Sequence, residues 1–259
     1  MFLSIVITIK NEADTIGSLL DSLKVQEPPF EIIIVDAEST DKTQKIVKEY
    51  MKKKSNIKLF IKSGSRGKGR NYGVTKATGE VVVFTDGGCT AEKDWLKYIR
   101  KKMNEGYDVV AGKTINTGTF TEIKRVEITQ KGVDITWPSC NLAYKKDLFE
   151  RINGFDEQFI TAEDIELNYK AIKAGAQIGY AEKSIIYRSS ALSKYQFIKQ
   201  SYWYGYGRKQ LTIKHGNLWG NYSANQLIQT QLSSHGIIRL FFGLTGYLVC
   251  VIQKGKPQK

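Results

Sequence analysis

Cysteine and histidine are scarce in this sequence, and their scarcity argues against several kinds of site. The three cysteines, Cys89, Cys140 and Cys250, are an odd number and include no CxxC pair. This argues against a disulfide framework and against a structural zinc site, and it suits a reducing compartment. The two histidines, His215 and His235, are too few for a multi-histidine metal site.

Acidic residues are missing from the last part of the chain. Residues 183–259 hold eleven of the 39 Lys and Arg side chains and none of the 26 Asp and Glu side chains. This segment therefore carries +11 of the formal net charge of +13. A fold does not require such an asymmetry. It indicates an anionic partner, which could be phosphate groups, a membrane surface or nucleic acid; a solvated basic face is the alternative.

Long apolar runs are also missing. The longest uncharged apolar stretch, residues 240–252, has 13 residues. As a helix it would be about 20 Å long, short of the roughly 30 Å of bilayer hydrocarbon, so we expect no membrane crossing. An interfacial helix, a re-entrant piece or a packed helix remain open. Lys254, Lys256 and Lys259 follow it, as suits an anionic cytoplasmic leaflet. The amino terminus enters a strand directly, so we expect no signal peptide.

Three apolar runs end in polar residues. Residues 81–85 (VVVFT) lead into Asp86 and two glycines, residues 32–35 (IIIV) lead into Asp36, and residues 3–9 lead into Lys10-Asn11-Glu12. Such runs read as strands buried on both faces of a parallel sheet. Ligands of open α/β sheets bind beyond the carboxyl ends of the strands. Helix caps explain each polar group singly, but three together favour a shared nucleotide site.

The order of the elements indicates an α/β fold with a mostly parallel sheet flanked by helices. Residues 113–138 are polar and aperiodic, and we expect a loop over a site. Residues 194–215 are predicted to be helical and crowd aromatic residues. The predicted strands are 3–9, 31–35, 57–61, 81–85, 109–112, 140–144, 177–181 and 185–188. The predicted helices before residue 194 are 13–26, 41–53, a short helix after the 64–70 loop that ends at Ala77, 93–104, 146–152 and 163–174.

Several motifs in fixed order resemble family 2 glycosyltransferases, which move a sugar from a nucleotide donor with inversion. Residues 162–167 (AEDIEL), with residues 153–157 (NGFDE) upstream, look like the acceptor half of that family. Other matching segments are residues 4–12, 35–41, 70–73 with Ala77 and 79–80, 86–88, and 205–208. The resemblance implies a GT-A-like (Rossmann-like) fold over residues 1–192, with a donor half at 1–112 and an acceptor half at 139–192. Residues 193–259 would form a basic, aromatic, helical appendage.

The resemblance also implies a role for individual residues. Asp164 would be the catalytic base on the acceptor hydroxyl, and Asp36 would hold the nucleotide base. The other donor-nucleotide residues would be Thr8, Ile9, Lys10, Glu12, Arg70, Asp86 and Gly87. Candidates on the diphosphate and acceptor side are Glu163, Arg188 and Arg208.

The metal site of the family is altered here. Asp86 could bind Mg²⁺ or Mn²⁺, but Gly88 stands where the family usually has a second acidic ligand. Arg188 stands where many relatives have a metal-ligating histidine. We therefore expect reduced metal dependence. Lys10 also replaces a usual aromatic residue, which bears on stacking of the base.

The expected function is transfer of a sugar from a nucleotide-diphospho-sugar to a glycan or polyprenyl-lipid-linked acceptor. The expected location is the cytoplasm, peripheral at the inner face of the cell membrane. Alternatives are a degenerate sugar-nucleotide-binding protein and a sugar nucleotidyltransferase, although the glycine-rich loop of the latter is missing after the first strand. A nucleic-acid-binding protein is a further alternative. It would leave Asp36, Asp86 and Asp164 without a purpose, so we expect no nucleic acid partner.

Overall fold

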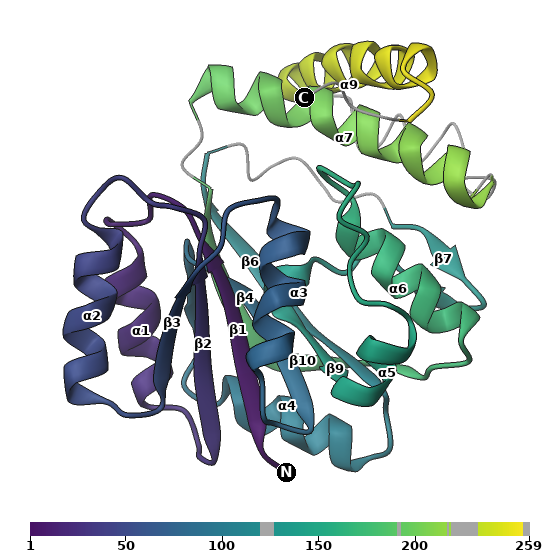
Figure 1. The fold of residues 1–259 in the computed structure, drawn as a ribbon. Coiled ribbons are helices and arrows are strands. Elements are labelled where there is room, and N and C mark those ends of the chain that lie inside the picture. Colours follow the sequence, from purple (N-terminus) through teal and green to yellow (C-terminus); the bar gives the residue numbers. More distant parts are fainter. Residues whose placement is uncertain (120–126, 191–192, 217, 219–232, 256–259) are drawn as a thin grey trace.

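The computed structural model describes residues 1–119, 127–190, 193–216, 218 and 233–255. Its centre is an eight-stranded sheet in the order β3-β2-β1-β4-β9-β6-β10-β5 (Figure 1). The strands are β1 (Leu3–Ile9), β2 (Phe30–Asp36), β3 (Ile57–Ile61), β4 (Val81–Asp86), β5 (Cys89–Ala91), β6 (Val109–Gly118), β9 (Leu142–Lys145) and β10 (Ile178–Ser190), and β7 (Thr129–Gln130) and β8 (Val133–Asp134) form a separate hairpin.

Strands β3, β2, β1 and β4 run parallel, as do β6 and β10. Antiparallel β9 joins the two groups, and antiparallel β5 lies at one edge. In this register Thr8 lies opposite both Val35 and Asp86, and Ile9 lies opposite Asp36. The predicted meeting of three strand ends at one edge of the sheet is thereby confirmed.

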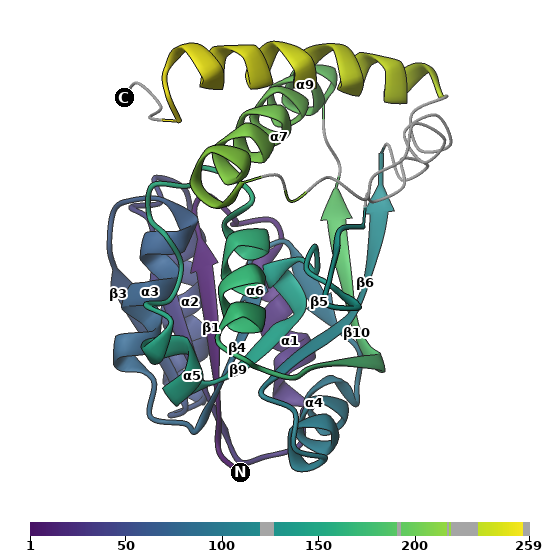
Figure 2. The same cartoon turned by 90° about the vertical axis from the view of Figure 1, so that its right-hand side faces the viewer.

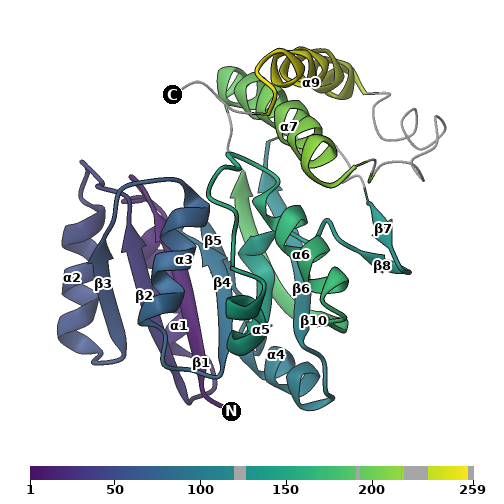
Figure 3. The ribbon, with the colours of Figure 1, turned by 45° about the vertical axis from the view of Figure 1, so that its right-hand side comes forward.

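Helices cover both faces of the sheet (Figure 3). Helices α1, α2 and α4 share one apolar core with β1, and α3, α5 and α6 share another on the opposite face. The chain also has a short 3-10 turn, η1 (Ser139–Asn141). The helices are α1 (Ile16–Lys24), α2 (Thr43–Lys53), α3 (Arg66–Lys76), α4 (Trp95–Asn104), α5 (Lys146–Arg151), α6 (Glu163–Lys173), α7 (Lys194–His215) and α9 (Ser234–Ile252).

The apolar runs form strands because their side chains are buried on both faces. In β1, Leu3, Ile5 and Ile7 enter the core with α1, while Val6 enters the core with α3. Successive strand residues point to opposite faces, so a strand covered on both sides must be apolar at every position. The predicted α/β class follows from this pattern and is confirmed.

Three of the predicted segments are wrong in detail. The short helix predicted after the 64–70 loop begins earlier, at Arg66, because Ser65 caps α3. Within residues 113–138, β6 continues to Gly118 and the β7–β8 hairpin follows, while residues 120–126 lie outside the described residues. Asn116 and Thr117 form strand without an apolar pattern because the far half of β6 pairs with β10 and is not buried between helices. The two predicted strands 177–181 and 185–188 are the single strand β10, with a register shift between Ala181 and Ile185.

Helices α7 and α9 pack against each other above the carboxyl edge of the sheet (Figure 2). Their backbones touch, since a Cβ added at Gly205 would overlap the carbonyl oxygen of Gly243, and one at Gly246 would overlap that of Tyr202. Small residues allow such an approach, as they do between packed membrane helices. Tyr206 also donates a hydrogen bond to Gln253 (3.0 Å).

The terminal helix is longer than its apolar run predicted. The side chain of Ser233 accepts a hydrogen bond from the backbone N–H of Gly236 (3.0 Å), so α9 begins at Ser234 and has 19 residues. Residues His235–Ile252 have a mean hydropathy of 1.7, enough in length and composition to cross a membrane, and 17% of them are buried. The core helix of a soluble protein passes the same test of length and composition, so this finding alone does not establish a membrane span.

Candidate active site

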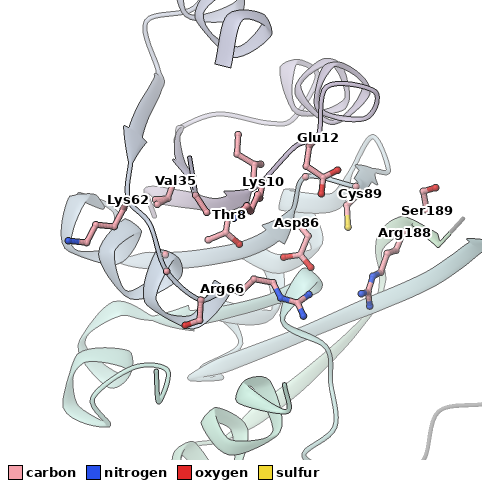
Figure 4. Close-up of a pocket in the computed structure, with 17 residues that line it drawn as sticks. Thr8, Lys10, Glu12, Val35, Lys62, Arg66, Asp86, Cys89, Arg188 and Ser189 are labelled. Atoms are coloured by element: carbon pink, nitrogen blue, oxygen red, sulfur yellow. The ribbon is translucent and has the colours of Figure 1, made fainter. Parts of the chain in front are cut away.

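A cavity of about 270 Å³ opens at the carboxyl ends of β1 and β4, beside the amino terminus of α3 (Figure 4). Its position is the one expected for ligands of α/β sheets. Seven of the predicted site residues line it: Thr8, Ile9, Lys10, Glu12, Asp86, Gly87 and Arg188. Thr8 Oγ1 is buried without a hydrogen-bond partner among the described residues, which leaves it available to a ligand.

Some lining residues were missed by the sequence analysis. Lys62 directly follows β3, and Arg66 is the first residue of α3, whose N-cap Ser65 accepts a hydrogen bond from the N–H of Lys68. Arg66 was anticipated only as part of the glycine- and arginine-rich run of residues 64–70, which the sequence places near the diphosphate together with Arg188. Cys89 and Ser189 follow Gly88 and Arg188 directly in the sequence, and the pairing of β5 with β10 brings both segments to the cavity.

The predicted base-binding carboxylate, Asp36, does not line this cavity. It is fully buried, and its Oδ1 accepts a hydrogen bond from the N–H of Ser39 (2.6 Å). Its other oxygen has no partner among the described residues, whereas the flanking residues Val35 and Ala37 do line the cavity. Asp36 therefore shapes the turn at the cavity wall in this structure, and contact with a nucleotide base stays a prediction.

Asp86 is surrounded by arginines. Arg70 Nη2 lies 2.7 Å from Asp86 Oδ1, and the charges of Arg66, also on α3, and of Arg188, on β10, act on the same carboxylate. Burial alone would raise the pKa of Asp86, but these three positive charges outweigh it and hold the pKa below its usual range. Asp86 is therefore ionised at neutral pH.

Arg70 joins the donor side of the site to the acceptor side. Its Nη1 lies 3.0 Å from Glu163 Oε1, and its side chain is only 1% exposed. The approach of α3 to the sheet makes this reach possible, because a Cβ at Gly69 would stand 2.9 Å from Thr8 Cγ2 and one at Gly73 would stand 2.5 Å from Val6 Cγ1. Arg70 does not line the cavity, so it acts on the site through its ion pairs with Asp86 and Glu163.

Asp164 lies in the first turn of α6, next to Glu163. Ala162, with φ of 63°, turns the chain into this helix. Asp164 Oδ2 accepts a hydrogen bond from the N–H of Ser139 (3.2 Å), which fixes the carboxylate. Burial, and then the charge of Glu163, raise the pKa of Asp164 to about 6. A carboxylate with this pKa is ionised at neutral pH and is more basic than an ordinary aspartate. Neither acid lines the cavity described above.

Helix α7 is tied to the same acidic helix by ion pairs. Lys214 lies 2.7 Å from Glu166 Oε1 and 2.6 Å from Asp156 Oδ2, and His215 lies 3.2 Å from Glu166. The Glu166 side chain is fully buried, whereas Lys214 keeps 40% of its side chain exposed to solvent. Arg208, the remaining predicted site residue, lies on α7 and does not line the cavity.

Comparison with protein families identifies the chain. A model described as "Glycosyl transferase family 2" matches residues 4–162, more than half of the sequence, and one described as "Glycosyl transferase family group 2" matches residues 125–253. The chain belongs to glycosyltransferase family 2. The predicted family and the predicted transferase class are thereby confirmed.

Two curated family 2 relatives match along most of the chain. The first is glycosyltransferase AglE of Haloferax volcanii, 27% identical over 202 residues that cover 71% of this chain and 66% of AglE. The second, from Methanococcus voltae, is a dolichyl N-acetyl-α-D-glucosaminyl phosphate 3-β-D-2,3-diacetamido-2,3-dideoxy-β-D-glucuronosyltransferase. It is 31% identical over 244 residues, which cover 83% of this chain and 75% of the relative. The chain thus spans about two thirds to three quarters of their lengths.

Solved structures show the same fold. TarS residues 1–349 of S. aureus in complex with UDP-GlcNAc superimposes with a TM-score of 0.66 at 22% identity, over 98% of this chain and 83% of the TarS chain. The mannosyltransferase PcManGT of Pyrobaculum calidifontis, in complex with GDP-Man and Mn²⁺, gives 0.65 at 19% identity over 96% and 75%. At these identities the likeness concerns the fold alone, and it confirms the GT-A-like architecture.

Proposed function

We propose that the protein is an inverting glycosyltransferase that moves a sugar from a nucleotide-diphospho-sugar to a hydroxyl of a glycan or polyprenyl-lipid-linked acceptor. The observation that carries this proposal is the single guanidinium of Arg70, which links Asp86 at the cavity to Glu163 beside Asp164. A donor in the cavity and an acceptor beside α6 would meet across this link. The M. voltae relative, whose name specifies a dolichyl-linked acceptor, supports the acceptor class.

Inversion requires one base on the side of the sugar opposite the leaving diphosphate. Asp164 has the pKa for this role, and its hydrogen bond from Ser139 holds it in place. Asp164 would take the proton of the acceptor hydroxyl while the oxygen attacks the anomeric carbon. Holding donor and acceptor in line would supply much of the rate.

The donor class is testable by thermal stabilisation. UDP-, GDP-, dTDP- and CMP-sugars are offered separately, and one of them is expected to raise Tm. At about 100 times Kd the stabilisation is about 2.7 kcal/mol, which shifts Tm by about 5–10 °C in a chain of this size. The free sugars serve as controls. If no nucleotide-sugar raises Tm, the donor-binding proposal is wrong, and a shift without release of nucleoside diphosphate to any acceptor would favour a degenerate binding protein.

We further propose that the packed pair of helices α7 and α9 lies on the cytoplasmic face of an anionic membrane. Its exposed apolar side chains recur every three or four residues along one face of α9: Ile237, Phe241, Leu244, Leu248 and Ile252. Residues 183–259 carry eleven cations and no acid, as suits an anionic leaflet. Lys254 follows α9 directly, while Lys256 and Lys259 lie outside the described residues.

Sedimentation with vesicles tests this placement. The full chain is expected to pellet with phosphatidylglycerol vesicles and to be released by high salt, because screening weakens surface attraction. The triple variant Ile237→Asn, Phe241→Asn, Leu248→Asn is expected to stay in the supernatant. A control variant, Val25→Asn with Ile61→Asn, removes exposed apolar residues elsewhere and should pellet normally. Equal pelleting of all three proteins, or no dependence on anionic lipid, would contradict the proposal.

A further inference from the structure

The residues around Asp86 do not fit a divalent cation held by the protein. Asp86 already faces three guanidinium groups, and Arg70 occupies its Oδ1 at 2.7 Å. Gly88, two residues further on, offers no ligand. Among the described residues, no three His, Cys, Asp or Glu side chains are placed to hold a metal ion together. A dication here would be repelled by the arginines that neutralise the one carboxylate it needs.

The charge of the cavity wall suits an anion instead. Four cationic side chains, those of Lys10, Lys62, Arg66 and Arg188, line the cavity against the two carboxylates of Glu12 and Asp86. The Glu12 carboxylate is engaged by the hydroxyl of Thr15 (2.6 Å), and burial, aided by the charge of Asp86, raises its pKa. With Arg70 against Asp86, the cavity carries a net positive charge in which a diphosphate would be stabilised.

Two of these cationic side chains, Arg66 and Arg188, lie on regular secondary structure. Arg188 lies on β10, opposite Cys89 of β5 on one side and Asn116 of β6 on the other. The adjacent N–H of Ser189 donates to the carbonyl of Gly88 (3.0 Å), so Arg188 is held against the turn that follows Asp86. Arg66 begins α3. In Figure 4 the side chains of Arg66 and Arg188 lie on either side of Asp86.

We propose that Arg66 and Arg188 bind the donor diphosphate in place of a protein-held divalent metal. The proposal rests on the proposed function, since a glycosyl donor is what brings a diphosphate to this cavity. When the bond between the anomeric carbon and the diphosphate oxygen breaks, its electron pair stays on that oxygen. The acceptor oxygen forms the new bond to the anomeric carbon, and Asp164 takes the proton of the acceptor hydroxyl. The two guanidinium groups stabilise the added negative charge on the leaving diphosphate. Guanidinium matches phosphate oxygens bidentately, and donors fixed before reaction need no reorganisation.

Calorimetric titration of the full chain with UDP, GDP, dTDP and inorganic pyrophosphate tests the assignment, each in excess EDTA and again with Mn²⁺. At least one nucleotide is expected to bind in EDTA, with a Kd within about threefold of that in Mn²⁺. Arg188→Met is expected to weaken binding in EDTA by about 10- to 100-fold, as does the loss of a charge-assisted hydrogen bond. Arg151→Met, an exposed arginine on α5, is the matched control and should bind normally.

Binding that disappears in EDTA and returns with Mn²⁺, while Arg188→Met binds like the unaltered chain, would overturn the assignment. If Arg188→Met does not fold, the EDTA comparison on the unaltered chain decides alone. A failed proposed function looks different, because no nucleotide would then bind with or without Mn²⁺. Pyrophosphate has no nucleotide base, so its binding tests the inference separately from the proposed function. Binding of pyrophosphate in EDTA supports the inference, and binding only with Mn²⁺, or no binding at all, refutes it.

Restoring the usual metal ligands in this chain gives a test that does not depend on catalytic activity. Gly88→Asp with Arg188→His supplies the two missing ligand types, and the position has room, since the nearest atom to a Cβ at Gly88 is Glu12 Oε2 at 3.8 Å. Relative to a solution of Mn²⁺ and UDP alone, the double variant is expected to lower the electron paramagnetic resonance signal of free Mn²⁺ further, whereas the unaltered chain is expected to leave it unchanged. Equal Mn²⁺ uptake by the unaltered chain would overturn the assignment.

Discussion

Replacing Asp164 by asparagine is expected to lower turnover by roughly 10²–10⁴-fold, the contribution of a positioned general base. Asparagine keeps the size of the side chain but cannot take the proton of the acceptor hydroxyl. Because Asp164 does not line the cavity, the Kd of the donor is expected to change little. The measurement is nucleoside diphosphate release with saturating donor and acceptor, beside calorimetric binding of the donor.

The pH profile separates loss of a base from loss of structure. The pKa of Asp164 is raised to about 6, so the active, ionised form disappears as the pH falls through this value. The kcat/KM of the unaltered chain should therefore fall about tenfold per pH unit below about pH 6. This limb should be absent from Asp164→Asn. Glu150→Gln, a largely exposed acid on α5, is the matched control and should keep both turnover and profile.

The same pKa has a consequence for stability. A carboxyl whose folded-state pKa lies above its unfolded value contributes stability at low pH, and this contribution is lost as the pH rises through about 6. Ionised Asp164 thus opposes folding at pH 8, and Asp164→Asn should not lower Tm there. Near-normal turnover, or a large fall in Tm at pH 8, would remove Asp164 from the proposed role.

Replacing Arg70 by methionine is expected to destabilise the fold more than any surface change. Arg70 is 1% exposed and pairs with Asp86 at 2.7 Å and Glu163 at 3.0 Å. Removing one member of a buried ion pair costs about 3–5 kcal/mol because its partners keep uncompensated charge. For a chain of this size the fall in Tm is about 6–20 °C. Thermal unfolding monitored by circular dichroism measures it.

A second substitution tests the cause of this destabilisation. Adding Glu163→Gln to Arg70→Met removes one of the two uncompensated carboxylates, so part of the lost Tm should return. Arg151→Met, an exposed arginine, is expected to change stability by less than about 0.5 kcal/mol. If Arg70→Met unfolds at the temperature of this control, the network does not stabilise the fold.

Much of the fold was readable from the sequence because the decisive signals are local. Strand β4 is apolar on both faces and ends in an acid, so its burial and its polar end appear in consecutive residues. The helices before residue 194 mostly begin and end within a few residues of the predicted bounds, since apolar periodicity defines them. The far half of β6 and the hairpin β7–β8 lack that signal, because their polar strands are paired but not covered by helices.

The sequence by itself determined the order of the apolar strands and of the helices before residue 194, the family, the basic character of residues 183–259 and the acids at the strand ends. Only the tertiary structure decided which of these side chains meet. Arg70 contacts Asp86 and also Glu163, which is 93 residues away from Arg70 in the sequence. Arg188 comes close to Asp86 through the pairing of β10 with β5. In the tertiary structure Asp36 is also buried away from the cavity, and α9 is longer than the apolar run of the sequence. Such contacts depend on the distance between elements in space, which spacing along a chain does not encode.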